Sequence, residues 1–186
     1  RGSGPSARRV AIHPYPAELA SRAVLPDGTA VTVRPIRPED AAMEQSFVAG
    51  LSETSRRFRF MMPVRELTPE MLARFTQIDY DREMALIAVD ESGGAELEGA
   101  VARYVALPDG ESCEFAIVAT DAWQGRGLGA LLLRRLADTA RAKGLKRMLG
   151  YVLADNAGML ALCRRLGCLM STDDQDPGLR VATLIL

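Results

Sequence analysis

Apolar residues follow two different spacings along the chain, and the spacing changes near residue 84. Before that point, two short apolar runs flank the turn Pro26-Asp27-Gly28, which predicts a hairpin of residues 24–25 and 29–33. Three helices are then predicted. They begin at Pro38, Ser52 and Thr68, because Pro, Ser and Thr are favoured at helix starts and acidic residues follow each of them.

From Met84 onward the pattern favours strands. Residues 84–89, 98–107 and 113–120 predict three strands, and the Gly-containing turns between them favour an antiparallel meander. The remaining predicted elements are a helix from the segment 124–129 to Lys143, a strand at 145–153, a helix at 156–166 and a hairpin of residues 168–171 and 179–186. This order is not a regular βαβ alternation, so it predicts a mixed α+β fold.

The first residues show little periodicity. We interpret residues 1–4, Arg-Gly-Ser-Gly, as a cloning scar, and residues 5–20, which contain three prolines, as a linker or surface arm. Residues 21–186 then form one domain. The start without Met suggests a fragment of a longer protein.

Composition narrows the functional classes. The formal net charge is −1, whereas a general nucleic-acid binder is expected to carry a basic excess. No apolar run is long enough to span a membrane. Three cysteines without a CxxC pair and a single histidine disfavour a disulfide framework and a zinc site. We therefore expect a cytoplasmic protein without a metal, a membrane anchor or a nucleic-acid partner.

The most informative segment runs from Trp123 to Ala130 and contains three glycines, between a predicted strand and a predicted helix. Free amides and the helix dipole make such a place suitable for a phosphate. A Rossmann fingerprint, Gly125-x-Gly127-x-x-Ala130, is one interpretation, but it should open a doubly wound sheet, and most of this chain precedes it. The second interpretation is an ordinary glycine-rich turn. Each glycine inside a helix costs about 1 kcal/mol of stability relative to alanine, so this cost favours a functional reason for the glycines. A coenzyme A pyrophosphate site is the third.

The third interpretation gains support from a family resemblance. Gln124-x-x-Gly127-x-Gly129 resembles the Q/R-x-x-G-x-G/A motif of the GNAT superfamily, and residues 32–40 resemble that family's first strand and helix start. Residues 79–86 resemble a segment of the bacterial Pat-type protein lysine acetyltransferases. Residues 11–16 resemble the junction behind their acyl-CoA-synthetase-like, ATP-grasp-containing region. The resemblance is collinear over roughly residues 10–186. It implies a GNAT fold: a mixed, mostly antiparallel sheet, splayed at the acetyl-CoA site and flanked by helices.

The resemblance also implies the site residues. Backbone groups of the strand before the loop, the loop amides and the start of the last long helix would bind acetyl-CoA: Ile117, Val118, Ala119, Gln124, Gly125, Arg126, Gly127, Leu128, Gly129, Ala130 and Asn156. Glu114 would be the general base. A lysine ammonium has no lone pair, and a buried carboxylate with a raised pKa could accept its proton. Without the resemblance, Glu114 is a solvated strand-end glutamate and Asn156 a simple N-cap; Glu111 is the nearest substitute base.

One position departs from the family pattern. Many GNAT enzymes place a tyrosine, as general acid, where this chain has Cys163. Either the thiolate leaves unaided or another group, such as Tyr80 or Tyr151, donates the proton. An acyl-carrying Cys163 is a further alternative, although a cysteine on an apolar helix face is usually inert core.

The expected function is an acetyl-CoA-dependent protein lysine N-acetyltransferase that acts by direct transfer, without a metal. The resemblance implies an acyl-CoA synthetase as the protein substrate, modified at its active-site lysine, and a native chain with an N-terminal synthetase-like region. A small-molecule amine N-acetyltransferase and a non-catalytic CoA-sensing module remain the alternatives. Arg56, Arg57 and Arg59 either grip an acidic protein surface or form a solvated helix face.

Overall fold

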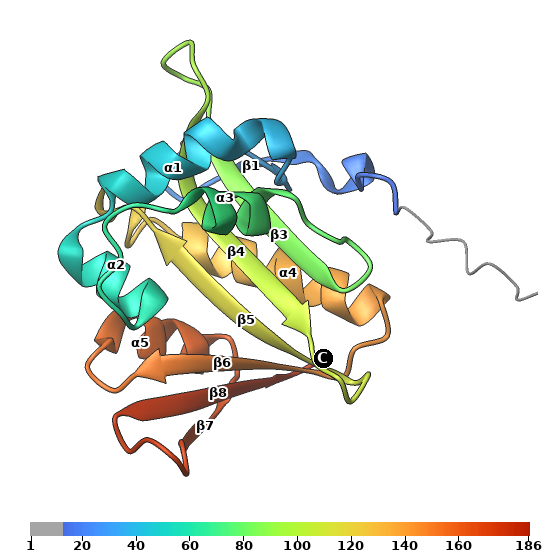
Figure 1. Ribbon diagram of the computed structural model, residues 1–186, viewed down its shortest axis with the longest axis vertical. Helices are drawn as coiled ribbons and strands as arrows, with labels where there is room; N and C mark the ends of the chain where they lie inside the picture. The colour runs from blue at the N-terminus through green and yellow to red at the C-terminus, as the bar shows by residue number, and fades with distance from the viewer. Residues whose placement is uncertain (1–12) are drawn as a thin grey trace, which may run out of the picture.

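A computed structural model describes residues 13–186, which form one eight-stranded sheet with helices on both faces (Figure 1). The strand order is β1-β2-β3-β4-β5-β6-β8-β7. The strands are β1 (Ser21–Val24), β2 (Ala30–Pro35), β3 (Glu83–Asp90), β4 (Leu97–Ala106), β5 (Ser112–Ala119), β6 (Arg147–Leu153), β7 (Leu169–Thr172) and β8 (Leu179–Ile185). The helices are α1 (Ala41–Gly50), α2 (Glu53–Phe60), α3 (Pro69–Thr76), α4 (Leu128–Ala142) and α5 (Ala157–Arg165), with short 3-10 turns η1 (Ala17–Leu19), η2 (Pro38–Asp40) and η3 (Asp121–Trp123).

The predicted α+β order is confirmed. β1 and β2 form the expected hairpin, and β3, β4 and β5 form the antiparallel meander. The side chains of Ser52 and Thr68 cap α2 and α3 by accepting hydrogen bonds from the amides of Ser55 and Met71. The 3-10 turn η3, before the glycine loop, is an element that apolar spacing did not reveal.

Two hydrophobic layers lie on opposite faces of the sheet. On one face, α4 buries Leu132, Leu133 and Leu136 completely against β2–β5, and α5 extends this layer. On the other face, α1 and α3 cover a smaller cluster that includes Phe47 and Ile87. In Figure 1, α1 and α3 lie in front of the upper strands and α2 lies beside the end of β5, whereas no helix lies in front of β6, β8 and β7.

The sheet changes character between β5 and β6. These two strands are parallel and pair only through Ser112–Phe115 and Arg147–Gly150, after which they diverge. The remaining residues of β5, 116–119, pair with β4 on one side and have no strand partner on the side of β6. The fold therefore contains the splay that the GNAT resemblance implied.

The described part of the N-terminal arm lies against the sheet. The hydroxyl of Tyr15 donates a 2.7 Å hydrogen bond to the carbonyl of Pro35, and its ring meets the ring of Tyr80 edge-on at 6.1 Å. The cloning scar and the first part of the arm, as predicted from the sequence, lie outside the described residues. Between residues 13 and 186, no helix is both long and apolar enough to cross a bilayer.

Candidate active site

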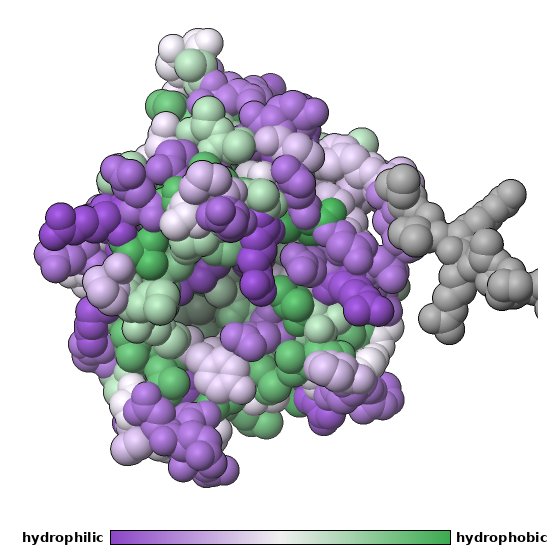
Figure 2. All heavy atoms as spheres, viewed as in Figure 1, coloured by the Kyte–Doolittle hydropathy of each residue, from purple (hydrophilic) through white to green (hydrophobic). Residues whose placement is uncertain are grey.

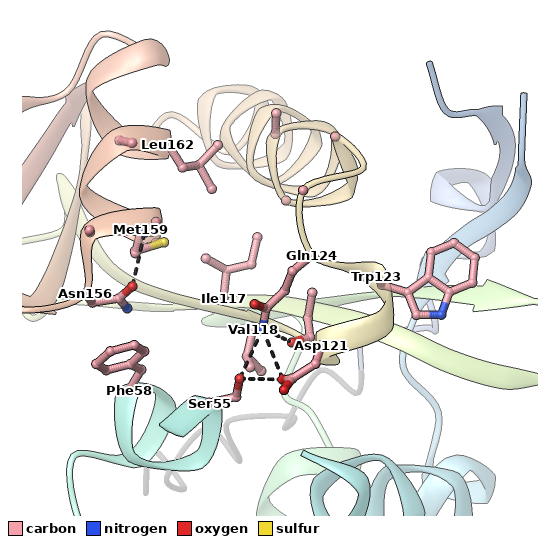
Figure 3. A pocket seen from close by; sticks show the side chains of 18 of the residues that line it. Ser55, Phe58, Ile117, Val118, Asp121, Trp123, Gln124, Asn156, Met159 and Leu162 are labelled. Atoms are coloured by element: carbon pink, nitrogen blue, oxygen red, sulfur yellow. Dashed lines mark hydrogen bonds between the residues drawn. The ribbon is translucent and has the colours of Figure 1, made fainter. Parts of the chain in front are cut away.

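The divergence of β5 and β6 opens a cleft of about 960 Å³ at the C-terminal ends of both strands. Residues of β5, the glycine loop, α5 and α2 line it, as the close view in Figure 3 shows. Its walls are apolar around Val118, Met159 and Leu162, and polar toward the start of α4. A long ligand with an apolar arm and an anionic end fits this distribution.

The glycine loop turns sharply into α4. Gly125 and Gly127 have φ angles of 73° and 87°, a left-handed conformation that strains other residues. Gly127 is also the N-cap residue of α4, so no side chain caps this helix, in contrast to α2, α3 and α5. The amides of the first turn of α4 have no helical acceptors and remain available to an anion.

Gly129, in that first turn, keeps the helix close to α5. A Cβ atom at Gly129 would lie 3.2 Å from Cδ2 of Leu162. The absence of a side chain there leaves the cleft open between the two helices.

Two side chains of the loop hold it in place instead of lining the cleft. Arg126 forms an ion pair with Asp27 at 2.8 Å, donates a hydrogen bond to Thr29 and stacks over the ring of Trp123 at 4.3 Å. Leu128 is 1% exposed and packs in the core. Of the predicted cofactor residues, the remaining nine line the cleft: Ile117, Val118, Ala119, Gln124, Gly125, Gly127, Gly129, Ala130 and Asn156.

A hydrogen-bonded cluster joins the loop to α2. The side-chain amide of Gln124 donates to Oγ of Ser55 and to the carbonyl of Ala119, both at 3.0 Å. Ser55 in turn donates to Asp121 at 2.9 Å, and Ser52 donates to the same carboxylate. Figure 3 shows this cluster at the edge of the cleft, where it positions α2 as a wall.

The far end of α2 reaches the opposite side of the cleft. Arg57 forms an ion pair with Asp155, which follows β6, at 2.9 Å. Phe58 faces Asn156 across the opening (Figure 3). Asn156 is confirmed as the N-cap of α5, because its Oδ1 accepts a hydrogen bond from the amide of Met159.

Several lining residues were not assigned to the site from the sequence. Arg134 on α4 and Arg165 on α5 place two guanidinium groups at the cleft, which suits a polyphosphate ligand. Residues of α2, together with Asp121 and Asp155, complete the wall. The local sequence signals for these residues were weak: Arg134 lies on the polar face of the helix after the glycine loop, and Ser52 begins the earlier helix α2.

Glu114 lies on β5 but outside the cleft. Its side chain points to the face that carries α1–α3 and lines a separate groove of about 320 Å³. The expectation that this carboxylate is buried is wrong, because Glu114 is exposed. The physical reason is its place on β5 beside β6, where the covering helices of this face end (Figure 1).

Glu111, the substitute base, is already paired. It forms ion pairs with Lys146 and Arg147, and the hydrogen bond from Lys146 lowers the pKa of its carboxyl. Its side chain lines neither the cleft nor the groove.

The candidates for a proton donor are not at the cleft. Cys163 is fully buried in the core, and its hydrogen bond with Cys168, followed by burial, raises the pKa of its thiol. Tyr80 is buried and donates to the carbonyl of Ile36, and burial raises its pKa. Tyr151 is 38% exposed on β6 and does not line the cleft. Within residues 13–186, no group of three or more potential metal ligands stands together.

Comparisons with known proteins find acetyltransferases both by sequence and by structure. The family model described as an acetyltransferase (GNAT) domain matches residues 30–169. An acetyltransferase of Pseudomonas aeruginosa is 39% identical over 124 residues, which make up 67% of each chain. The crystal structure of the GNAT domain of S. lividans PAT is 29% identical, with a TM-score of 0.85 over 93% of this chain and 100% of that one.

A more distant likeness is a mutant form of a cAMP-binding acyltransferase from Mycobacterium smegmatis. It is 25% identical, with a TM-score of 0.59 over 91% of this chain and 48% of that one. This chain therefore spans about half the length of that acyltransferase.

Proposed function

The chain belongs to the GNAT acetyltransferase family, and from this premise we propose that it transfers an acetyl group from acetyl-CoA to the side-chain amine of a protein lysine. As a GNAT domain it is an acyltransferase with the GNAT fold, and GNAT domains in general use acetyl-CoA. One observation carries the proposal. The cleft begins at the uncapped start of α4 and runs to β5, the strand that also bears Glu114.

Different groups of the chain would take different roles in this reaction. The first amides of α4, with Arg134 and Arg165, would hold the phosphates of the donor. The unpaired edge of residues 116–119 would hydrogen-bond the pantetheine arm. Glu114 would accept the proton of the lysine ammonium, directly or through a water, so that the neutral amine attacks the thioester.

As the C–S bond breaks, the attacking nitrogen releases its second proton to water, and the leaving thiolate needs no donor from the chain in this scheme. A thiol has a pKa of about 8.5, so its anion is a stable leaving group near neutral pH. Buried Cys163 and Tyr80 would then act in packing only, in agreement with their surroundings.

The proposed protein substrate is an acyl-CoA synthetase, acetylated in the cytoplasm at its active-site lysine. Support comes from the resemblance of residues 79–86 and 11–16 to Pat-type enzymes, and from the similarity to the GNAT domain of S. lividans PAT. A native chain with an N-terminal synthetase-like region belongs to the same proposal.

A mass-spectrometric screen tests this function. Purified acyl-CoA synthetases are incubated with the protein and acetyl-CoA, and we expect acetylation of a single lysine together with loss of synthetase activity. The Glu114→Gln variant is the matched control. Acetylation of free amines but of no protein would replace the proposal with a small-molecule acetyltransferase. Tight acetyl-CoA binding without transfer to any amine would replace it with a sensor module.

A further inference from the structure

The groove that contains Glu114 meets the cleft along a single strand. Residues 117–119 of β5 line the cleft, whereas Glu114, Phe115 and Ala116 line the groove. Glu114 and Val118 are four residues apart on the same face of β5, which corresponds to about 13 Å. Figure 2 shows this face of the molecule hollowed below α3, with hydrophilic and hydrophobic side chains around the hollow. On the proposed function, the groove is where the acceptor enters.

Most charges that line the groove are arranged by element, and the exception is Arg103 of β4, which pairs with Glu44. Two arginines come from the helices, Arg59 from α2 and Arg74 from α3. Two carboxylates come from the strands, Glu83 from β3 and Glu114 from β5. Among the ion pairs of the described residues, none involves any of these four side chains. The groove therefore presents arginines on its helical wall and carboxylates on its floor that form no ion pairs with each other, although Glu114 attracts the charge of Arg59 at longer range.

Arg59 is the more restrained of the two arginines. It is half-buried, and its guanidinium stacks at 5.0 Å over the ring of Phe60 and at 5.8 Å over that of Phe75. No side chain or backbone carbonyl of the described chain accepts a hydrogen bond from it. Burial and then the neighbouring Arg103 lower the pKa of Arg59 to about 10, so it is still charged at neutral pH. A fixed guanidinium without an acceptor is prepared for an anion.

The other buried charged groups beside Arg59 are only partly paired: Oε2 of Glu44, both carboxylate oxygens of Glu98 and Nε of Arg103 have no hydrogen-bond partner among the described residues. Arg103 pairs with Glu44 at 3.3 Å and donates to the carbonyl of Phe75. Burial, and then the nearby Glu44 carboxylate, raises the pKa of Glu98 well above its usual range. None of these groups forms an ion pair or a hydrogen bond with Arg59, although Glu44 attracts its charge at longer range.

We propose that Arg59 is a specificity determinant that binds an acidic side chain of the protein substrate, located within a few residues of the acetylated lysine. The lysine ammonium then points to the carboxylates of the strands, and the acidic side chain points to the arginines of the helices. This inference rests on the proposed protein-lysine activity and adds a sequence requirement to it. It selects an acidic segment over a basic one because no group of the described chain accepts a hydrogen bond from Arg59 or pairs with it at contact distance.

Lysine peptides of matched sequence test this requirement. One series carries Asp or Glu at each position within three residues of the lysine, and a second series carries Asn or Gln there. For the wild type, we expect kcat/KM to be about tenfold higher with the best acidic peptide, the effect of one charge-assisted hydrogen bond. Arg59→Gln should reduce this ratio to about one, mainly by raising KM for the acidic peptide.

Charge reversal separates recognition from a structural role. Arg59→Glu should invert the preference, so that a peptide with Arg or Lys near the target lysine becomes the better substrate. Arg56→Gln is the matched control, because Arg56 is on the same helix but lines neither cavity, and it should keep the wild-type ratio. The melting temperature of each variant shows that it is folded.

Three outcomes would overturn the inference. The first is a wild type that acetylates both peptide series equally well. The second is an Arg59→Gln variant that keeps the acidic preference. The third is an equal loss for every peptide, which would mean that Arg59 acts through Glu114. A wild type that acetylates no lysine in peptides or proteins would overturn the proposed function itself, and the inference with it.

Discussion

Glu111 and Glu114 are three residues apart, yet their side chains have different surroundings. Glu111 is held by Lys146 and Arg147 at the start of β5. Glu114 lines the groove beside the cleft and forms no ion pair within residues 13–186. A base must be free to bind the proton it removes, so the structure favours Glu114 over Glu111.

Glu114→Gln should lower turnover by about 10²–10⁴-fold at neutral pH, the usual contribution of a general base, while acetyl-CoA affinity changes little. The deficit should shrink as the pH rises toward the lysine pKa of about 10.4, because more of the amine is then already neutral. The measurement is turnover from pH 6 to 9 with a synthetase or a lysine peptide as acceptor.

The control is Glu111→Gln, which removes a carboxylate from the same region and should leave turnover within about twofold, because surface ion pairs contribute little. Wild-type rates for Glu114→Gln at every pH would remove this residue from the mechanism. Loss of acetyl-CoA binding in that variant would mean that Glu114 maintains the shape of β5.

At the scale of elements, α4 combines two roles. Its apolar face fills the larger core, and its uncapped first turn lines the cleft. A negative charge in the first turn of a helix stabilises the helix by about 0.3–1 kcal/mol. The same charge would occupy the place where phosphates are expected to bind, so one substitution can separate folding from binding.

Ala130→Glu makes this test. Ala130 lies in the first turn of α4, lines the cleft and is half-buried in an ordinary helical conformation. We expect an unchanged or higher melting temperature and an acetyl-CoA affinity at least about tenfold lower, through repulsion and bulk. Isothermal titration calorimetry and thermal unfolding measure the two effects.

Ala130→Gln, which adds similar bulk without the charge, should show a smaller loss of affinity. Gly127→Glu is a poorer probe, because its φ is 87° and a Cβ there would lie 3.3 Å from Pro26, so the variant would also be strained. Normal affinity in Ala130→Glu would refute the assignment of the anion site to the start of α4.

Local signals predicted most of these elements, and long-range contacts explain what they missed. The caps at Ser52 and Thr68 and the turn at Pro26-Asp27-Gly28 each depend on a few adjacent residues, so the sequence was sufficient. The contact between Ser55 and Gln124 joins residues 69 positions apart, and no local pattern reports such a contact. The exposure of Glu114 was missed for the same reason, because the strand pattern does not report whether a helix covers that position.

At the scale of the whole molecule, the cleft divides the sheet into two parts. β5 and β6 share only four residue pairs, and beyond them the parts are joined through the helices and by contacts such as Arg57–Asp155. That ion pair is exposed and so adds little to stability. A ligand that contacts β5, α4 and α5 together would therefore connect the two parts of the native state.

Acetyl-CoA should accordingly raise the melting temperature. A ligand at 100 times its Kd stabilises the native state by about 2.7 kcal/mol, which for a protein of this size corresponds to about 5–10 °C. NADH should give no shift, because the described sheet is mostly antiparallel and lacks the doubly wound arrangement of a dinucleotide fold. Differential scanning calorimetry over a range of ligand concentrations is the measurement, and the shift should grow with the logarithm of concentration.

Ala130→Glu should lose the shift at the same concentrations while unfolding normally without ligand. Stabilisation by NADH and none by acetyl-CoA would overturn the assignment of the cleft, whereas an equal shift in wild type and Ala130→Glu would place the ligand away from α4.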